Sequence, residues 1–197
     1  MSNVSLVSST YRDQQRARQD ELDSLRAPVA EGSRLFLLSI ESNTATDPQQ
    51  ALKDIEAAGI SHLDVAIANA GILPTPKPLD VVDVEDEVTA FQINVIGPIR
   101  LYQAAKPLLE KSASPKWVSV SNAGSFTTNL DIHNASFVGA YAVSKGRPKL
   151  AHCLNGDGAA PNTVEESGSK TFELIDKPTR EQTSRKFINV IDQGEIS

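Results

Sequence analysis

Short apolar runs, separated by amphipathic or polar stretches, predict strands that alternate with helices. The alternating, β-branched stretch from Asn3 to Ser9 predicts a short strand. The continuous apolar run from Ser33 to Ile40 predicts a strand that is buried on both faces, as in a parallel sheet. Similar runs predict further strands at residues 62–68, 116–120 and 185–191.

The first helix between these runs carries its own start signals. Asp47 is the expected N-cap, Pro48 the first-turn proline and Gln50 the capping-box partner. The helix is predicted to continue through Ile55 and to end at Gly59.

Further helices are predicted over residues 84–95 and 98–111. A second capping box, Thr163 with Glu166, predicts a helix through Ile175. Strands that alternate with helices indicate an α/β fold, a layered sheet with right-handed crossovers. The chain has no internal repeat or low-complexity tract, so we interpret its 197 residues as one domain.

The composition excludes several classes of protein. The chain is 40% hydrophobic and 22% charged, which is typical of a soluble globular domain. A net charge of −6 and scattered basic residues argue against a nucleic-acid partner. The single cysteine, Cys153, excludes an internal disulfide. No apolar run approaches the roughly 20 residues of a membrane span, and no signal-peptide pattern begins the chain. A cytoplasmic protein is expected.

Four groups of polar side chains follow the predicted strands or lie in the helices after them. Ligands of parallel α/β sheets bind outside the carboxyl ends of the strands, so these groups are the candidate site. The groups are Asn69 to Gly71, Asn94, Ser121 with Ser125, and Tyr141 with Lys145.

Together these side chains fit the reduction of a carbonyl group. Hydride attack leaves negative charge on the carbonyl oxygen, which then needs a proton and a hydrogen-bond donor. The Tyr141 hydroxyl can supply the proton, although the ordinary tyrosine pKa is about 10. Lys145 lies one helical turn later on the same face, and its charge favours tyrosinate and lowers that pKa. A serine would hold the substrate oxygen, and an asparagine would relay a proton through water.

At these motifs the chain resembles the short-chain dehydrogenase/reductase family. NAG at Asn69 to Gly71, Asn94, the serine loop after KWVSV and YAVSK at residues 141–145 match the family's motifs in order and roughly in spacing. Each motif alone is weak, but the ordered set is specific. The resemblance covers most of residues 3–192 and extends to fungal ketoreductases of secondary metabolism, of the norsolorinic acid ketoreductase type.

The resemblance implies a catalytic role for several residues. Tyr141 corresponds to the proton donor, Lys145 to the residue that lowers its pKa, and Asn94 to the relay. Ser121 corresponds to the serine that orients the carbonyl, with Ser125 as the alternative.

The resemblance also implies a nicotinamide cofactor, with NADP(H) favoured over NAD and no metal. Lys145 and Tyr141 would contact the nicotinamide end, and Asn69 would line a ribose. Glu41 would lie near the adenine, and Arg12 stands where NADP-preferring members read the 2′-phosphate. The implied reaction reduces a ketone of polyketide type, or oxidises the corresponding alcohol.

Simpler interpretations of these residues remain open. Tyr141 with Lys145 would suit an amphipathic helix end, and Asn69 with Gly71 would suit an ordinary turn. Arg12 would suit a solvated surface charge. The histidines have no metal-ligand spacing among themselves or with the cysteine.

The chain also departs from the family. It contains no TGxxxGxG loop, whose backbone N–H groups would hold the cofactor pyrophosphate, and the family's first strand is missing. After Lys145 a late strand is missing, and Pro148 should end the helix near Gly146. The expectation is therefore an incomplete, Rossmann-like doubly wound parallel sheet, with a recognisable core over residues 1–150 and a shortened part over 151–197.

Two functions follow as expectations. The first is an NADP(H)-dependent oxidoreductase whose activity is impaired by the missing segments, through an altered gene model or splice form. The second is a non-catalytic remnant that acts as a binding or dimerisation partner. The helices predicted at 84–111 and near 141–150 correspond to elements that often form oligomer interfaces in the family, so a homo-oligomer is expected. An unfolded fragment is the third interpretation.

Overall fold

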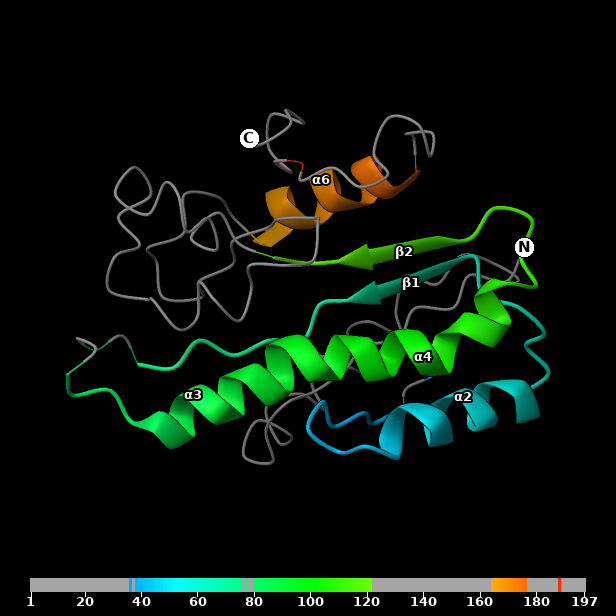
Figure 1. Ribbon diagram of the computed structural model, residues 1–197. Coiled ribbons are helices and arrows are strands. Elements are labelled where there is room, and N and C mark those ends of the chain that lie inside the picture. Colours follow the sequence, from blue (N-terminus) through cyan, green and yellow to red (C-terminus); the bar gives the residue numbers. More distant parts are fainter. Residues whose placement is uncertain are drawn as a thin grey trace. The chain divides into compact units, whose positions relative to one another are not determined.

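The computed structural model describes residues 36, 38–75, 77, 80–121, 164–176 and 188. The chain divides into two compact units, Met1–Ile72 with Phe91–Trp117 and Leu73–Ala90 with Val118–Ser197. The expected strand at 3–9 and the helix break at Pro148 lie outside the described residues. The helices and strands, drawn in Figure 1, are α2 (Asp47–Ala57), β1 (Val65–Ala68), α3 (Val84–Phe91), η2 (Gln92–Ile96), α4 (Gly97–Leu109), β2 (Lys116–Ser119) and α6 (Val164–Asp176).

The two described strands confirm the predicted sheet type. β1 and β2 pair in a two-stranded sheet, and their arrows run in the same direction, so the pair is parallel (Figure 1). The helical run from α3 to α4 connects them, as an α/β crossover requires. β1 begins later than predicted, because the Leu63 N–H donates to the Leu108 carbonyl of α4 at 3.1 Å instead of to a strand. The α/β class predicted from the sequence is therefore confirmed.

The strand predicted over residues 33–40 is not seen in its described part. Residues 36 and 38–40 do not belong to a strand. Ile40 is nevertheless buried, at 2% exposed, and Leu38 packs against the apolar core. The apolar pattern thus predicted burial correctly. It failed on the backbone, because an apolar run specifies burial and does not by itself specify a strand.

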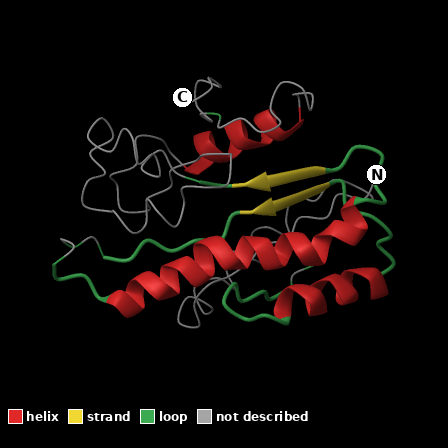
Figure 2. Cartoon of the chain, viewed as in Figure 1, coloured by secondary structure: helices red, strands yellow, loops and turns green. Residues whose placement is uncertain are grey.

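The two helices predicted over 84–95 and 98–111 form one helical run, α3–η2–α4 (Figure 2). The break expected between them is a π-helical turn, in which the Gly97 N–H donates to the carbonyl of Gln92, five residues earlier. Pro98 explains the position of this turn. Proline has no N–H and cannot complete the ordinary bond to the carbonyl of Asn94, so the helix widens there instead of ending.

The core of the first unit is built by α2, β1, α4 and the segments next to them. Burying one leucine or isoleucine side chain contributes about 1.5–3 kcal/mol, so these side chains supply the main stabilisation of the unit. Trp117 of β2 packs against the core and also makes an edge-to-face contact with Tyr102 of α4. One buried cluster contains Leu52, Ile55, Ile60, Leu63, Ala66, Ala105, Leu108 and Leu109, and a second contains Ile40, Ala51, Ala68 and Leu101.

The start of α2 differs from its prediction. The N-cap is Thr46, without a side-chain cap bond, and Asp47 is the first helical residue. The Asp47 carboxylate accepts a hydrogen bond from the Glu41 N–H at 3.1 Å. The Gln50 side chain donates to Asp54 at 2.8 Å and does not reach back to the cap. The capping-box prediction was wrong, because Asp47 bonds to the preceding turn instead of to its own helix.

Gly59 ends α2 as predicted, through a Schellman motif. The Ile60 N–H donates to the Ile55 carbonyl at 3.2 Å, and the Gly59 N–H donates to the Glu56 carbonyl at 2.9 Å. Gly59 has φ of +85°, a left-handed conformation that only glycine adopts without strain.

Replacing Gly59 with alanine is expected to lower the free energy of unfolding by about 1 kcal/mol, because the Cβ is strained at this φ. Gly168 of α6 is the matched control, since its backbone is helical and a Cβ at this position would meet no atom within 4 Å. Gly168→Ala should instead stabilise its helix by about 0.5–1 kcal/mol. Urea unfolding measures both variants, and an equal effect of the two would contradict the assignment of Gly59.

Candidate functional site

The described part of the candidate site is centred on Asn94, in the π-helical turn η2. Asn94 is 1% exposed. Its Oδ1 accepts a hydrogen bond from the Ile72 N–H at 2.9 Å, and its Nδ2 donates to the Ile72 carbonyl at 2.9 Å. The amide therefore binds both backbone groups of one residue, 22 positions earlier in the chain.

This pair of bonds fixes the segment that follows β1. Asn69 is the first residue after β1 and is exposed, and Ile72 directly follows the NAG segment, three residues after Asn69. A residue held at both its N–H and its carbonyl cannot rotate away from its partner without losing two hydrogen bonds. Asn94 thus positions the NAG segment, and its predicted role as a proton relay stays a prediction.

Glu41 lies in a turn after the segment 38–40. The Thr44 N–H donates to the Glu41 carbonyl at 3.0 Å, and the Asp47 carboxylate accepts from the Glu41 N–H. Glu41 is half-buried. The turn therefore has a fixed backbone, which is the condition for its side chain to contact a ligand reproducibly.

The other predicted site residues are placed less fully. Ser121 follows β2, is 2% exposed and belongs to the second unit. Tyr141, Lys145 and Ser125 lie outside the described residues, as does Arg12. The structure therefore describes Asn69, Glu41 and Asn94 within one unit and tests no contact of the catalytic pair.

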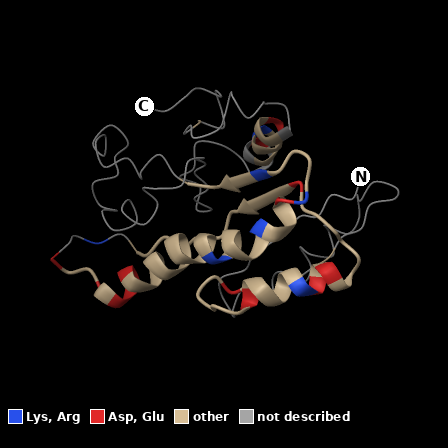
Figure 3. Ribbon diagram, turned by 45° about the vertical axis from the view of Figure 1, so that its right-hand side comes forward, with Lys and Arg blue, Asp and Glu red and all other residues tan. Residues whose placement is uncertain are grey.

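The described residues do not suit the pyrophosphate of a dinucleotide cofactor. Helix N-termini bind phosphate through free N–H groups and the positive end of the helix dipole, and neighbouring carboxylates oppose this. In the described ranges, carboxylates occupy the first turns of the separate helical runs, and Figure 3 shows those of α2 and α3 in red. The sequence contains no glycine loop, and the described helical runs begin with acidic residues. The described residues therefore offer no binding site for the cofactor pyrophosphate, and we derive no step through the pyrophosphate. The acidic residues are Asp47 in α2, Glu85, Asp86 and Glu87 in α3, and Glu166 in α6.

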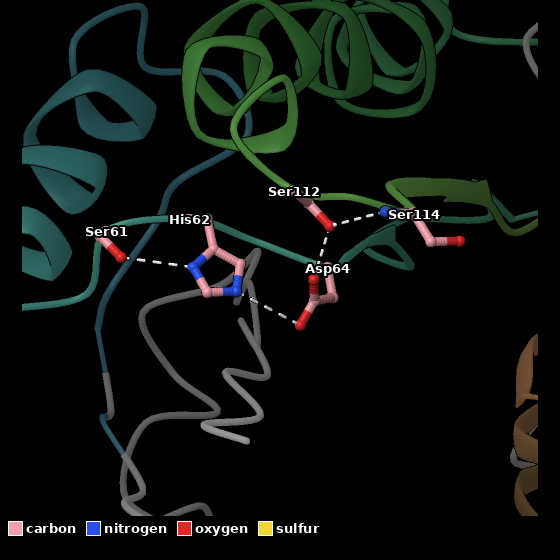
Figure 4. Close-up of polar contacts among 5 residues, drawn as sticks. All are labelled: Ser61, His62, Asp64, Ser112 and Ser114. Carbon is pink, nitrogen blue, oxygen red and sulfur yellow. Dashed lines mark hydrogen bonds and ion pairs between the residues drawn. The ribbon is translucent and has the colours of Figure 1, made fainter.

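A second polar cluster lies just before the amino ends of the strands (Figure 4). His62 lies between Ser61, whose Oγ is 3.3 Å from His62 Nδ1, and Asp64, whose Oδ2 is 3.7 Å from His62 Nε2. Ser112 donates to Asp64 at 2.5 Å and accepts from the Ser114 N–H at 3.2 Å. His62 and Asp64 are 47% and 48% exposed, so bulk water reaches both. The cluster links the loop before β1 to the loop before β2.

Sequence patterns singled out Asp47 and Asn94, but for other roles, and did not indicate the bonds by which they hold these turns. The Asp47 bond to Glu41 joins residues six apart, and the Asn94 bonds join residues 22 apart.

The exposed Lys106 donates to Glu110, and this bond and the carboxylate charge raise the pKa of Lys106, which lies on the solvent side of α4. Within the described ranges, no cluster of three or more His, Cys, Asp or Glu could hold a metal ion. No described helix combines the length and apolarity that a membrane crossing requires.

Comparison with protein families and curated proteins identifies relatives. A family model described as Enoyl-(Acyl carrier protein) reductase matches residues 7–172. The short-chain dehydrogenase srdF of Neurospora crassa is 35% identical over 196 residues, which cover 84% of this chain and 77% of the relative. The norsolorinic acid ketoreductase of Aspergillus parasiticus is 28% identical over 199 residues, covering 85% of this chain and 73% of the relative. Both relatives come from fungi, as the resemblance predicted.

Solved structures share the fold. The NADPH-bound carbonyl reductase from chicken fatty liver has a TM-score of 0.77 at 19% identity, covering 98% of this chain and 87% of that one. A short-chain dehydrogenase from Shigella flexneri has a TM-score of 0.56 at 23% identity, covering 72% of this chain, which spans only 51% of that protein's length. The fold neighbours confirm a Rossmann-like α/β architecture. With the family match, the ordered motifs and the fungal relatives, they show that the chain belongs to the short-chain dehydrogenase/reductase family.

Proposed function

We propose that the chain is an NADP(H)-dependent reductase of a ketone, able to catalyse the reverse oxidation of an alcohol. The family makes it an oxidoreductase by type. The observation that carries the proposal is the clamp of buried Asn94 on Ile72, which fixes the NAG segment at the carboxyl end of β1. That edge of a parallel sheet is where ligands bind.

Relatives support the finer parts of the proposal. The Aspergillus parasiticus relative is named a ketoreductase of norsolorinic acid, and the chicken structure contains NADPH. We take a polyketide-derived ketone as the substrate class, NADP(H) as the cofactor and the cytoplasm as the location. We expect no nucleic-acid partner, because the net charge is −6 and the basic residues are scattered along the sequence.

The roles of the residues follow the family pattern. Tyr141 donates a proton to the carbonyl oxygen, Lys145 stabilises the tyrosinate that remains, and Ser121 orients the carbonyl. Ser125 is the alternative to Ser121. The nicotinamide supplies the hydride when it is bound. Asn94 keeps the NAG segment in place through its amide, and we assign it the relay of a proton through water.

Cofactor affinity should be weak, because no glycine loop occurs in the sequence and carboxylates begin the described helical runs. Millimolar NADPH is expected to raise the melting temperature of the chain, since a ligand that binds only the native state stabilises it. NADH should raise it less. Reduction of norsolorinic acid by NADPH, followed through the loss of NADPH absorbance, tests the reaction itself.

The outcomes of these measurements separate the interpretations. Cofactor binding with turnover of the ketone supports the proposed function. Absence of any shift with either cofactor at millimolar concentration contradicts it. If the chain shows no cooperative thermal unfolding, the third interpretation, an unfolded fragment, is supported.

A second candidate is a non-catalytic binding or dimerisation partner. Large apolar side chains face solvent along the helical run 84–109, and such surfaces often mark protein contacts. Sedimentation of the chain alone tests this function, and a strictly monomeric chain would contradict homo-dimerisation. The exposed side chains are Val84, Val88, Phe91, Ile99 and Tyr102.

A further inference from the structure

Gly97 and Arg100, which lie on the same helical run as Asn94, contact the turn that carries Glu41. Arg100 Nη1 donates to the Asn43 carbonyl at 3.0 Å, across 57 positions of the sequence. Gly97 is buried against Ser42, which is 8% exposed. A Cβ at Gly97 would lie 2.9 Å from the Ser42 Cβ and 3.1 Å from the Ser42 carbonyl oxygen.

The turn is therefore held from two sides. From α2, the Asp47 carboxylate accepts the Glu41 N–H at 3.1 Å. From α4, Arg100 binds the carbonyl of Asn43, and Gly97 allows the backbone of Ser42 to approach the helix. A larger residue than glycine would force the turn outward, because a contact under 3.0 Å between carbon atoms is not tolerated.

Asn94, Gly97 and Arg100 follow one another at intervals of three residues. Residues three apart lie close together on one side of a helix, although the π turn shifts the exact register. Through this set, one rigid element fixes both the NAG segment and the Glu41 turn. The separation of the two loops is thereby set by the helix and not by the loops themselves.

We propose that Gly97 and Arg100 are positioning residues for the Glu41 turn and thereby for the adenosine end of the cofactor. The inference rests on the proposed function, because Glu41 is expected near the adenine only in that case. It predicts a division of labour along one helix. Asn94 supports the NAG segment, whose Asn69 is expected to line a ribose, and Gly97 with Arg100 supports the adenosine side.

The test compares Arg100→Ala, Arg100→Lys and Gly97→Ala with wild type, and uses Lys106→Ala as the control for loss of a cation on the same helix. Hydrogen exchange measured by mass spectrometry reports the opening of residues 38–46 and of 69–75. Arg100→Ala should speed exchange in residues 38–46 about tenfold, the contribution of a hydrogen bond from a charged donor. Arg100→Lys should recover part of the protection, and exchange in residues 69–75 should not change.

Ligand fragments provide the second readout. Adenosine 2′,5′-bisphosphate carries the adenosine end of NADP, and reduced nicotinamide mononucleotide carries the other end. Arg100→Ala and Gly97→Ala should weaken binding of the first fragment by about tenfold and leave the second unchanged. A purely structural role would weaken both fragments equally through general loss of stability.

The results for the inference and for the proposed function can be told apart. Unchanged exchange at 38–46 in both Arg100→Ala and Gly97→Ala overturns the positioning role, even if wild type binds NADPH. Equal loss of both fragments also overturns it. If wild type binds neither fragment, the proposed function fails, and selective opening of 38–46 still decides whether these residues position the turn.

Discussion

At neutral pH, an Asn94→Asp variant is expected to unfold with about 3 kcal/mol less free energy than wild type. The new carboxylate still accepts the Ile72 N–H, but it has no hydrogen to donate to the Ile72 carbonyl. Two oxygens then face each other at a position that is 1% exposed in wild type. Replacing a buried hydrogen-bond donor with a charged acceptor is among the most destabilising of single changes.

The loss should depend on pH with a defined sign. Burial and the nearby carbonyl oxygen raise the pKa of the new carboxyl above its ordinary value of about 3.9. Its protonated form donates to the Ile72 carbonyl and accepts from the Ile72 N–H, as the amide does. The stability of the variant is therefore near that of wild type below the unfolded-state pKa. It falls as pH rises and levels off above the raised pKa of the folded state.

Urea unfolding of both proteins from about pH 4 to neutral pH measures this dependence. Asn69→Asp is the matched control, because Asn69 is exposed at the other end of the same segment and the same change should cost little there. A loss that is equal at both ends of the pH range would show that the Asn94 amide does not hold Ile72. So would the absence of any loss.

Parts of the fold could be predicted from the sequence because their causes are local or periodic. The apolar runs at 62–68 and 116–120 both contain strands of a parallel sheet, although β1 is shorter than predicted. The end of α2 at Gly59 was predicted because one residue determines it. These features need little knowledge of what lies across the fold.

The features that were not predicted depend on distant partners. The run at 33–40 has the pattern of a buried strand, but the pattern specifies burial and not the backbone, and Ile40 is buried outside a strand. The π turn follows from Pro98, which a pattern marks as a helix boundary although the helix continues. Asp47 has the identity of an N-cap, yet its carboxylate serves Glu41.

The candidate site likewise contains residues that the sequence identified and residues that it did not. The motif residues Asn69 and Asn94 were identified from their places after a predicted strand and in the helix that follows it, and the family resemblance then implied their roles. Gly97 and Arg100 belong to none of those motifs, because their importance lies in contacts with Ser42 and Asn43. A glycine in a helix and an arginine one turn later are ordinary in a sequence and become informative only when the facing turn is known.

Replacing Tyr141 with phenylalanine is expected to lower the rate of NADPH-dependent ketone reduction by about 10²–10⁴-fold, the usual contribution of a general acid. The change removes one hydroxyl and keeps the ring, so packing and the cofactor-induced rise in melting temperature should persist. The rate is measured by loss of NADPH absorbance with norsolorinic acid at millimolar cofactor. This concentration offsets the weak affinity expected of a chain without a glycine loop.

Tyr102→Phe is the matched control for this prediction. Tyr102 is 41% exposed on α4, and its ring meets Trp117 edge to face with centroids 5.1 Å apart, so the phenylalanine ring preserves the contact. Its rate should equal that of wild type. A Tyr141→Phe variant with undiminished turnover would assign the proton to another donor. Loss of the Tyr141 hydroxyl therefore tests catalysis by this chain most directly. It should lower turnover if the chain is a reductase, whereas partner binding by a non-catalytic remnant would not change.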